Sequence, residues 1–304
     1  ARNISASSAS YGSWPASVEL DGTDAAIVRE LRVDGRISFE ALAGRVGLSR
    51  AAARLRVRRL LDTDTLRVVG VAHPAVRDIG ALAHLSISVE GAAAPIADLI
   101  AELAEVPLVS LTSGRFPLNA EVRGRDLEQL TAAVDRVRML PGVREIDTAV
   151  YTSVLKDPYL ASSTSPHIRL DETDLRLLSL LERDGRLSFA ELAGRVGLSA
   201  GAVRSRVMRL IRGHAVRVTA LLNPGAVGLA RHGGVALRLE GDSRTAIKEI
   251  ASWEHTQFLA RCLGRADLIG TVAANSISGL HTVFEHLNAL SGIRVVESWI
   301  CLSH

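Results

Sequence analysis

The chain has 304 residues, of which 47% are hydrophobic and 23% charged, and its net charge is +3. This balance is typical of a folded globular protein and excludes a disordered or collagen-like chain. No apolar run approaches the roughly 18 residues of a membrane span, and the only cysteines, Cys262 and Cys301, form neither a metal-binding spacing nor a disulfide framework, so we expect a cytoplasmic protein without membrane contact, metal or cofactor.

The first predicted domain, residues 20–73, is helical. Asp21, Ser38 and Ser49 each stand at an N-cap position before a run with helical spacing, and Gly47 ends the second run. Three short helices with a tight turn between the second and third are typical of a helix-turn-helix. The third helix is the one that such a motif places against DNA.

The second predicted domain, residues 74–154, alternates strands and helices. A further strand over 66–71 precedes it, and Pro74 ends that strand. The order βαββαβ indicates a ferredoxin-like domain. Its predicted elements are a strand at 82–90, a helix at 96–103, strands at 108–112 and 118–122, a helix at 127–140 and a strand at 143–154.

The whole pattern then recurs 150 residues later. Residues 42–49 and 192–199 share the same eight letters, and 24 of the 41 positions in 20–60 are identical in 170–210. A duplicated module of this size is expected to fold as a homodimer does, either within one chain or with a half from another chain. The predicted domains are a flexible tail (1–19), a helix-turn-helix domain (20–73), a βαββαβ domain (74–154), a linker (155–169), a second helix-turn-helix domain (170–223) and a second βαββαβ domain (224–304).

The chain resembles the Lrp/AsnC, or feast/famine, family of transcription regulators. The motif D-G-R-x-S-x-x-x-L-A-x-x-V-G-L-S occupies Asp34–Ser49 and Asp184–Ser199, and R-V-x-R-L follows at Arg56–Leu60 and Arg206–Leu210. The resemblance implies an α+β fold with two winged or helix-turn-helix domains, each followed by a ferredoxin-like domain, in tandem. It also implies double-stranded DNA as a partner and self-association into a dimer or a higher assembly.

The third helix of each copy is rich in arginine and contains no acid over 49–61 and 199–213. Cationic side chains neutralise DNA phosphates, and arginine also pairs with base edges. We expect Arg50 and Arg54 to contact bases and Arg58, Arg59 and Arg209 to contact phosphates, whereas Arg56 and Arg206 could instead brace the motif. The predicted DNA-binding residues are Ser49, Arg50, Arg54, Arg56, Arg58, Arg59, Ser199, Arg204, Arg206, Arg209 and Arg212. Ala200 replaces Arg50 in the second copy, so we expect the second copy to read DNA less specifically.

The family's back domain binds small effectors, often amino acids, near a G-x-x-D loop, and the resemblance places such a site here. The loop is complete in Gly264–Asp267, but its counterpart Gly114–Pro117 lacks the aspartate, so we expect the two pockets to differ. The alternative is a plain hairpin glycine with a solvated aspartate. The predicted effector-binding residues are Ser113, Gly114, Leu263, Gly264 and Asp267.

Two other functions remain open. Sirohaem decarboxylases resemble this fold and include double-length chains. Their W-P-Y-N-like run is only partly matched by Phe116–Asn119, which lacks the Trp and the Tyr. The chain could also be a protein-interaction module whose DNA-binding front is degenerate. His281, Glu285 and His286 gather on one predicted helix, which we interpret as a solvated face and not as a metal site. We therefore expect a regulator and not an enzyme.

Overall fold

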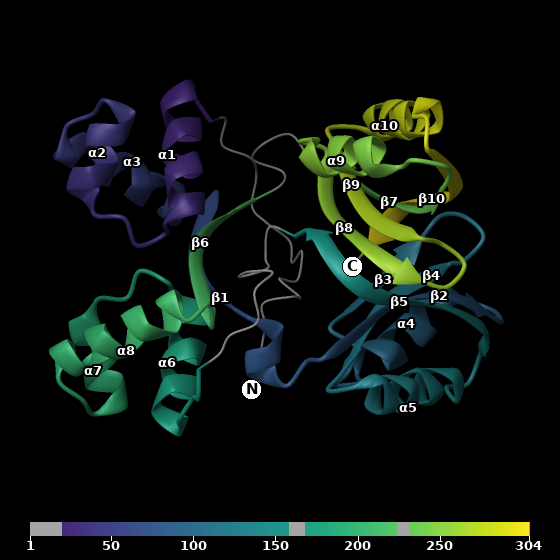
Figure 1. Cartoon of the computed structure of the whole chain (residues 1–304), viewed down its shortest axis with the longest axis horizontal. Helices are drawn as coiled ribbons and strands as arrows, with labels where there is room; N and C mark the ends of the chain where they lie inside the picture. The colour runs from purple at the N-terminus through teal and green to yellow at the C-terminus, as the bar shows by residue number, and fades with distance from the viewer. Residues whose placement is uncertain (1–19, 158–167, 224–230, 304) are drawn as a thin grey trace. The chain divides into compact units, whose positions relative to one another are not determined.

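The structure, a computed structural model, describes residues 20–157, 168–223 and 231–303 (Figure 1). These residues form two compact units, and each unit takes one part from each copy of the repeat. One unit holds both helix-turn-helix domains, and the other holds both βαββαβ domains. None of the described helices combines the length and the apolar content that a membrane crossing needs. The predicted tail and most of the predicted linker lie outside the described residues.

Each helix-turn-helix domain contains three helices that begin at the predicted caps. Asp21 and Asp171 form capping boxes with residues three positions later, and Gly47 and Gly197 end the second helices with a left-handed backbone. The helices are α1 (Gly22–Val33), α2 (Phe39–Val46) and α3 (Arg50–Asp62) in the first copy, and α6 (Glu172–Arg183), α7 (Phe189–Val196) and α8 (Ala200–Arg212) in the second.

The buried face of each domain is aliphatic, with fully enclosed side chains such as Leu31, Leu42 and Leu60 in the first copy. After α3, Asp64 adopts a left-handed backbone, as does His214 after α8. Glycine favours this conformation, so the aspartate and the histidine adopt it at some cost.

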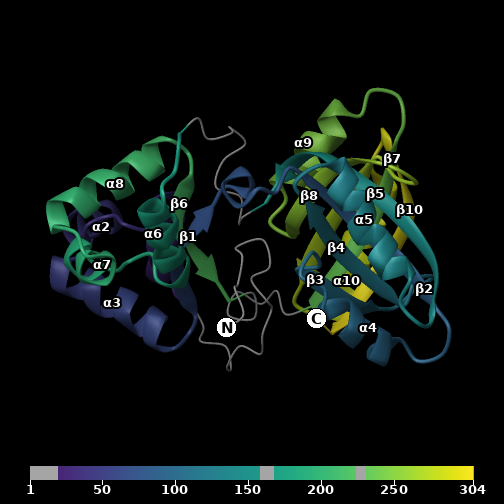
Figure 2. The same ribbon diagram turned by 90° about the horizontal axis from the view of Figure 1, so that it is seen from below.

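A two-stranded sheet joins the two helix-turn-helix domains. Strand β1 (Leu66–Ala72) pairs antiparallel with β6 (Val216–Leu222), so that Val68 lies opposite Ala220 (Figure 2). The side chains of this sheet contribute to the cores of both domains. The sequence left open whether the halves pair within one chain or between chains, and here the two copies pair within one chain.

The βαββαβ domains together close a single barrel. After the short 3-10 turn η1 (Pro74–Arg77), the first copy supplies strands β2 (Ala81–Val89), β3 (Leu108–Thr112), β4 (Leu118–Gly124) and β5 (Val143–Lys156), with helices α4 (Ala93–Ala101) and α5 (Leu127–Arg138). The second copy supplies β7 (Arg231–Leu239), β8 (Thr256–Leu263), β9 (Leu268–Ala274) and β10 (Ile293–Ser303), with helices α9 (Arg244–Ser252) and α10 (Ile277–Ala289).

The described strands run around the barrel in the order β10-β3-β4-β2-β5-β8-β9-β7. Two seams, β5 with β8 and β10 with β3, join the copies, and each copy's helices lie outside its own strands (Figure 1). Each set of helices covers an aliphatic core, and the opposite face of the strands forms the barrel interior. The sequence predicts a linker from residue 155, but β5 continues to Lys156, which lies opposite Leu259. The first two predicted linker residues are therefore strand, because they complete a seam.

Candidate nucleic-acid interface and barrel site

Helix α3 presents a row of arginines to solvent. The side chains of Arg50 and Arg58 are 73% and 75% exposed, and their nearest carboxylates, on Glu40 and Asp62, stand 4.0 and 3.5 Å away. Arg54 is exposed as well. Exposed ion pairs of this length are weak, so all three guanidinium groups can turn to a ligand.

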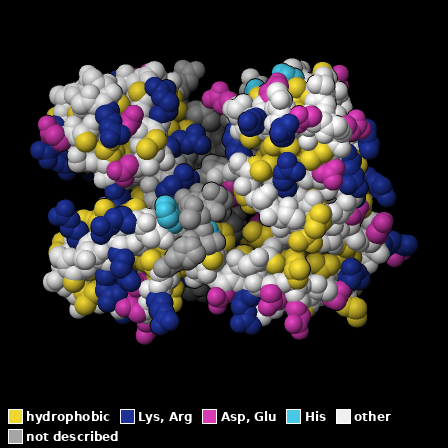
Figure 3. Space-filling model, viewed as in Figure 1, with side chains coloured by type: hydrophobic (Ala, Val, Ile, Leu, Met, Phe, Trp, Pro, Cys, Tyr) yellow, Lys and Arg dark blue, Asp and Glu magenta, His cyan; other side chains and the backbone are white. Residues whose placement is uncertain are grey.

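Helix α8 presents fewer cations. Arg204 and Arg212 are exposed, and the Arg212 Nε donates to the carbonyl of Met208 at 3.1 Å. On the face drawn in Figure 3, Lys and Arg side chains lie over both helix-turn-helix domains. The hydroxyls of Ser49 and Ser199 accept hydrogen bonds from Ala52 N and Ala202 N, both at 3.2 Å, and therefore cap α3 and α8. These two serines therefore determine where α3 and α8 begin.

The remaining predicted arginines hold the motif together. Asp24 is fully buried and accepts hydrogen bonds from Arg56 at 2.9 Å and from Arg59. Arg56 also reaches Asp21 at 2.6 Å, and this contact raises the pKa of Arg56 and lowers that of Asp21. A buried carboxylate needs such partners.

The second copy repeats this network atom for atom. Asp174, also fully buried, receives Arg206 at 2.8 Å and Arg209, and Arg206 reaches Asp171 at 2.6 Å. The bracing role considered for Arg56 and Arg206 thus matches their contacts. For Arg59 and Arg209 we predicted phosphate contacts, and the structure instead engages both in pairs with buried aspartates.

A reciprocal arginine clasp, formed by Arg36 and Arg186, links the two domains. Arg36 donates to the carbonyls of Gly185 and Leu187 at 2.6 and 2.9 Å and lies 4.7 Å from the Phe189 ring centre. Arg186 makes the mirrored contacts with the first copy, donating to Gly35 O at 2.9 Å. Burial lowers the pKa of both arginines. Nothing in the sequence predicted that the arginine of the D-G-R motif joins the two copies.

The glycines of the clasp allow the two domains to approach each other. Gly35 N donates to Val218 O at 2.9 Å, and Gly185 N donates to Val68 O at 2.8 Å. A Cβ at Gly35 would lie 3.0 Å from backbone atoms of β6, and one at Gly185 would lie 2.9 Å from the Val69 carbonyl carbon of β1. Side chains at these positions would therefore separate the domains. A surface pocket of about 330 Å³ opens beside the clasp, and Arg50 is among its lining residues.

The predicted effector residues lie on the two hairpin loops at the barrel seams. Ser113 donates its N–H to Ile300 O at 2.9 Å and accepts from Ile300 N at 3.0 Å, which ties the first loop to β10. Gly264 lies against β5, where a Cβ would come within 2.6 Å of Thr148 O. Gly114 and Gly264 both have positive φ, at 122° and 150°. Each copy's loop thus closes against the other copy.

Arg265 links the two loops, and the sequence analysis did not select it. Its guanidinium contacts Asp147 of β5 at 3.1 Å and Glu297 of β10 at 2.6 Å, and its side chain is only 17% exposed. Asp147 and Glu297 are equivalent positions in the repeat. Arg265 also stands 5.0 Å from the ring centre of Phe116 on the other loop. The signal that the sequence offered was an arginine after the loop glycine in both copies, Arg115 and Arg265.

Asp267 does not offer a free carboxylate. It accepts from Arg238 at 3.0 Å and from Leu239 N at 2.9 Å, and Arg238 also donates to Gly264 O at 3.2 Å. These bonds hold the loop shape, so an ammonium group would have to compete with Arg238. The fifth predicted residue, Leu263, is 68% exposed beside this loop.

The barrel interior is polar on the first copy's wall. His84 and Ser86 of β2 face inward with Asn119 and Glu121 of β4, and burial lowers the pKa of His84 to about 4. Burial raises the pKa of Glu121 to about 7. In the second copy these positions are small or apolar, namely Gly234, Ala236, Ile269 and Thr271.

Trp299 of β10 crosses from the second copy to that polar wall. Its ring stacks on His84 at 5.5 Å between ring centres, and its Nε1 donates to the Asn119 side-chain oxygen at 3.0 Å once the amide is correctly oriented. The ring occupies the space above Gly234, where a Cβ would lie 2.0 Å from it. Ala149 holds the equivalent position in the first copy, so this contact has no mirror image.

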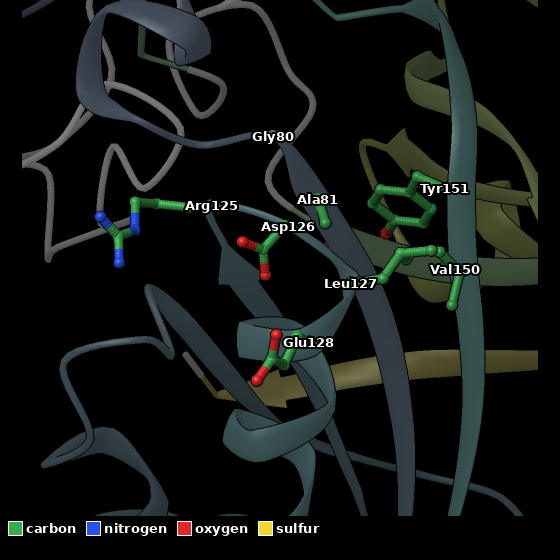
Figure 4. A pocket seen from close by; sticks show the side chains of 8 residues that line it. All are labelled: Gly80, Ala81, Arg125, Asp126, Leu127, Glu128, Val150 and Tyr151. Carbon is green, nitrogen blue, oxygen red and sulfur yellow. The ribbon is translucent and has the colours of Figure 1, made fainter.

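A second pocket, of about 570 Å³, opens at the end of the first copy's wall. Asp126 and Glu128 line it at the start of α5, and Tyr151 lines it from β5, while Arg125 points away (Figure 4). A Cβ at Gly80 would lie 2.1 Å from Arg125 O, which explains the glycine at this close approach. No motif in the sequence predicted this pocket.

Two family models match the chain. An AsnC-type helix-turn-helix domain matches residues 20–61 and again 170–211, and a C-terminal dimeric alpha+beta barrel domain matches residues 88–164. The chain is 32% identical to an uncharacterized HTH-type transcriptional regulator of Pyrococcus abyssi, over 46% of this chain and 90% of the relative. It is also 32% identical to the leucine-responsive regulatory protein of Rhizobium meliloti, over 44% of this chain and 90% of that protein.

Among solved structures, the siroheme decarboxylase NirDL aligns over 92% of this chain and 91% of its own, with a TM-score of 0.64 and 15% identity. At this identity the likeness shows the fold alone: a double-length chain with two helix-turn-helix domains and two ferredoxin-like domains.

Proposed function

The chain belongs to the Lrp/AsnC family of DNA-binding transcription regulators, and we propose that its reader helices, α3 and α8, bind two half-sites on one duplex. The observation that carries this proposal is the contrast among the arginines. Arg50, Arg54 and Arg58 are exposed and weakly paired, although arginines one turn away are engaged with buried aspartates. Fully exposed cations on the third helix match the contact surface of a helix-turn-helix.

The clasp and the β1–β6 sheet support the use of both readers at once. Together they hold α3 and α8 in one compact unit, so that binding of one helix presents the other to the same duplex. The family usually obtains such a pair from two chains, and this chain contains both copies. Association of whole chains with one another stays a prediction.

The test is DNA affinity against salt. Arg54→Ala with Arg204→Ala should weaken binding of the full chain to a duplex pool by at least tenfold and reduce the slope of log affinity against log salt by about 1 to 2. Fluorescence anisotropy between 50 and 300 mM KCl would measure both quantities. Arg144→Ala, an exposed barrel arginine, is the matched control. Equal slopes for all three proteins would overturn the assignment of the readers.

For the effector, we propose a small molecule with a carboxylate, such as an amino acid, at the two hairpin loops around Arg265. Its carboxylate would exchange with Asp147 or Glu297 as the partner of Arg265, which would loosen one seam of the barrel. Loosening a seam gives a physical route by which a ligand changes the barrel.

A thermal-shift screen against the amino acids, followed by calorimetry on Leu263→Trp, would test this site. Leu263 is exposed, so tryptophan there obstructs the loop without entering the packed seam that Gly264 occupies. Loss of binding with an unchanged melting temperature supports the site. Unchanged affinity places the ligand elsewhere.

The decarboxylase interpretation has only the shared fold in its favour. The exposed arginines of α3 are needed for DNA contact and have no part in tetrapyrrole chemistry, so they favour the regulator.

A further inference from the structure

The two reader helices share one frame but present different surfaces. Val57 and Val207 are both fully buried, and each helix begins at a capping serine. The bracing arginines are also equivalent. One buried position also differs, Ala53 against Val203, but the capping and bracing contacts are the same, so the differences that a ligand can meet are those of the outward side chains.

The outward side chains differ at five positions. Two of the three largest changes in size or charge replace an arginine of α3, since Arg50 is matched by Ala200 and Arg58 by Met208, and the third pairs Leu55 with Ser205. Two further exposed positions differ, Ala51 with Gly201 and Asp62 with Arg212. All ten residues are exposed, with Leu55 71% exposed and Met208 38% exposed. None of these differences is required by the core, because each side chain points away from it.

Each difference changes what the helix can recognise. An arginine can bind guanine through two hydrogen bonds or pair with a phosphate, and the alanine at position 200 can do neither. An exposed leucine offers an apolar contact to a thymine methyl group, whereas Ser205 offers a hydroxyl. Exchanging Arg58 for methionine removes one phosphate contact.

One reading residue is common to both helices, because Arg54 and Arg204 are equivalent and both exposed. The two half-sites should therefore share the group that this arginine contacts and differ at the neighbouring base pairs. Asp62 offsets one of the five arginines of α3, and Arg212 is the fourth arginine of α8, so both helices carry a formal charge of +4. The difference between them therefore lies in where the arginines stand and not in the total charge.

We propose that the target of this chain is one duplex with two unlike half-sites in a fixed order, one contacted by Arg50, Leu55 and Arg58 of α3 and the other by the different side chains at the same positions of α8. This inference rests on the proposed function. A homodimer presents the same helix twice and so reads a palindrome. Here the clasp joins two domains whose third helices differ. The twofold symmetry of the domain cores therefore does not extend to the side chains that face outward from α3 and α8.

In vitro selection from randomised duplexes of about 40 base pairs, with the full chain, tests this proposal. The wild type should enrich a site whose two half-sites, about one turn apart, differ in sequence. An enriched site with two identical half-sites would overturn the inference and leave the proposed function standing. No enrichment, together with no salt-dependent binding, would overturn the proposed function itself.

Two matched variants assign the half-sites. In the first, Ala200→Arg, Gly201→Ala, Ser205→Leu, Met208→Arg and Arg212→Asp give α8 the surface of α3, and selection should then return a site with twofold symmetry. In the second, Arg50→Ala, Ala51→Gly, Leu55→Ser, Arg58→Met and Asp62→Arg give α3 the surface of α8.

The second variant should also favour symmetric sites, with at least tenfold weaker binding to the wild-type site. All ten positions are exposed, so both variants should keep the wild-type melting temperature. Unlike half-sites that persist in both variants would show that other residues set the asymmetry, and would overturn the assignment.

Discussion

The two copies make equivalent structural contacts in the helix-turn-helix unit but different contacts in the barrel. In the first unit, the structural contacts come in equivalent pairs: Asp24 and Asp174 are each held by two arginines, and Arg36 and Arg186 clasp each other's domains. In the barrel, the strands keep the twofold arrangement, but the inward side chains do not. Trp299 crosses to His84 without a mirrored contact, and Arg265 pairs with both Asp147 and Glu297, whereas its counterpart Arg115 lies over the Phe116 ring.

This difference shows where each unit needs symmetry. A pair of readers must be placed alike to meet one duplex, so the frame that positions them is kept in both copies. A barrel interior has a single volume shared by two walls, and a large side chain on one wall requires a small one opposite. Within each wall the same rule holds between neighbouring strands, where the large Trp299 lies opposite Gly234 and His84 lies opposite Ala149.

The largest effect should follow from removing the unmatched contact. Trp299→Ala should lower the free energy of unfolding by about 3–5 kcal/mol, because it leaves a cavity beside Gly234 and frees the Asn119 amide from its partner. Urea unfolding followed by circular dichroism would measure the loss. The control is Leu302→Ala on the same strand, which is 67% exposed and should change stability by less than about 0.5 kcal/mol. Equal effects of the two variants would refute the packing role of Trp299.

The clasp should show equal effects in its two halves. Arg36→Ala and Arg186→Ala should each cost about 1–3 kcal/mol, because each removes hydrogen bonds from a charged, half-buried donor to two carbonyls. Hydrogen exchange of β1 and β6 amides would measure the local opening. The control is Arg58→Ala, an exposed arginine. Effects that differ by more than about 1 kcal/mol between the two halves would contradict the mirrored arrangement.

The polar wall should give the barrel two opposing pH responses. Glu121 has a folded pKa of about 7 against 4.5 unfolded, so it binds more protons when folded, and its contribution falls as pH rises from 4.5 to 7. His84 has a folded pKa of about 4 against 6.5 unfolded, so its contribution rises between pH 4 and 6.5. In the wild type the two responses offset each other over most of this range.

Single variants should separate these responses. Glu121→Gln should make stability rise more steeply between pH 4.5 and 6.5 and should stabilise the protein by about 1–3 kcal/mol at pH 7.5. His84→Asn should make stability fall with pH over the same window. Urea unfolding at several pH values would measure both slopes. Thr271→Val, at the counterpart of Glu121, should change neither slope. Parallel pH profiles for all the variants would show that these two groups do not titrate as described.

The smallest effect on stability should come from the reading surface. Leu55→Ser should change the free energy of unfolding by less than about 0.5 kcal/mol, because the side chain is 71% exposed. Thermal unfolding would measure the change. A large loss would mean that Leu55 packs against part of the protein, and its exposure would then no longer mark a contact for DNA.

The sequence predicted the helices, the strands and the family because those depend on local signals: caps, glycine stops and hydrophobic periods. It did not predict the β1–β6 sheet, the clasp or the contact of Arg265 with Asp147, because each depends on a partner in the other copy. The helix pattern also did not reveal that Arg59 and Arg209, which we predicted to contact phosphates, pair with buried aspartates.

The seams of the barrel have a consequence for how the protein is made. Strands β5 and β3 meet β8 and β10, which belong to the second copy. During synthesis the first copy leaves the ribosome with both of these edges open, and at common elongation rates its partner strands follow on the order of ten seconds later. Until then the exposed edges can pair with another nascent chain. Tethering the copies makes the correct partner the nearest one, so the fusion favours self-pairing over exchange between polysomes.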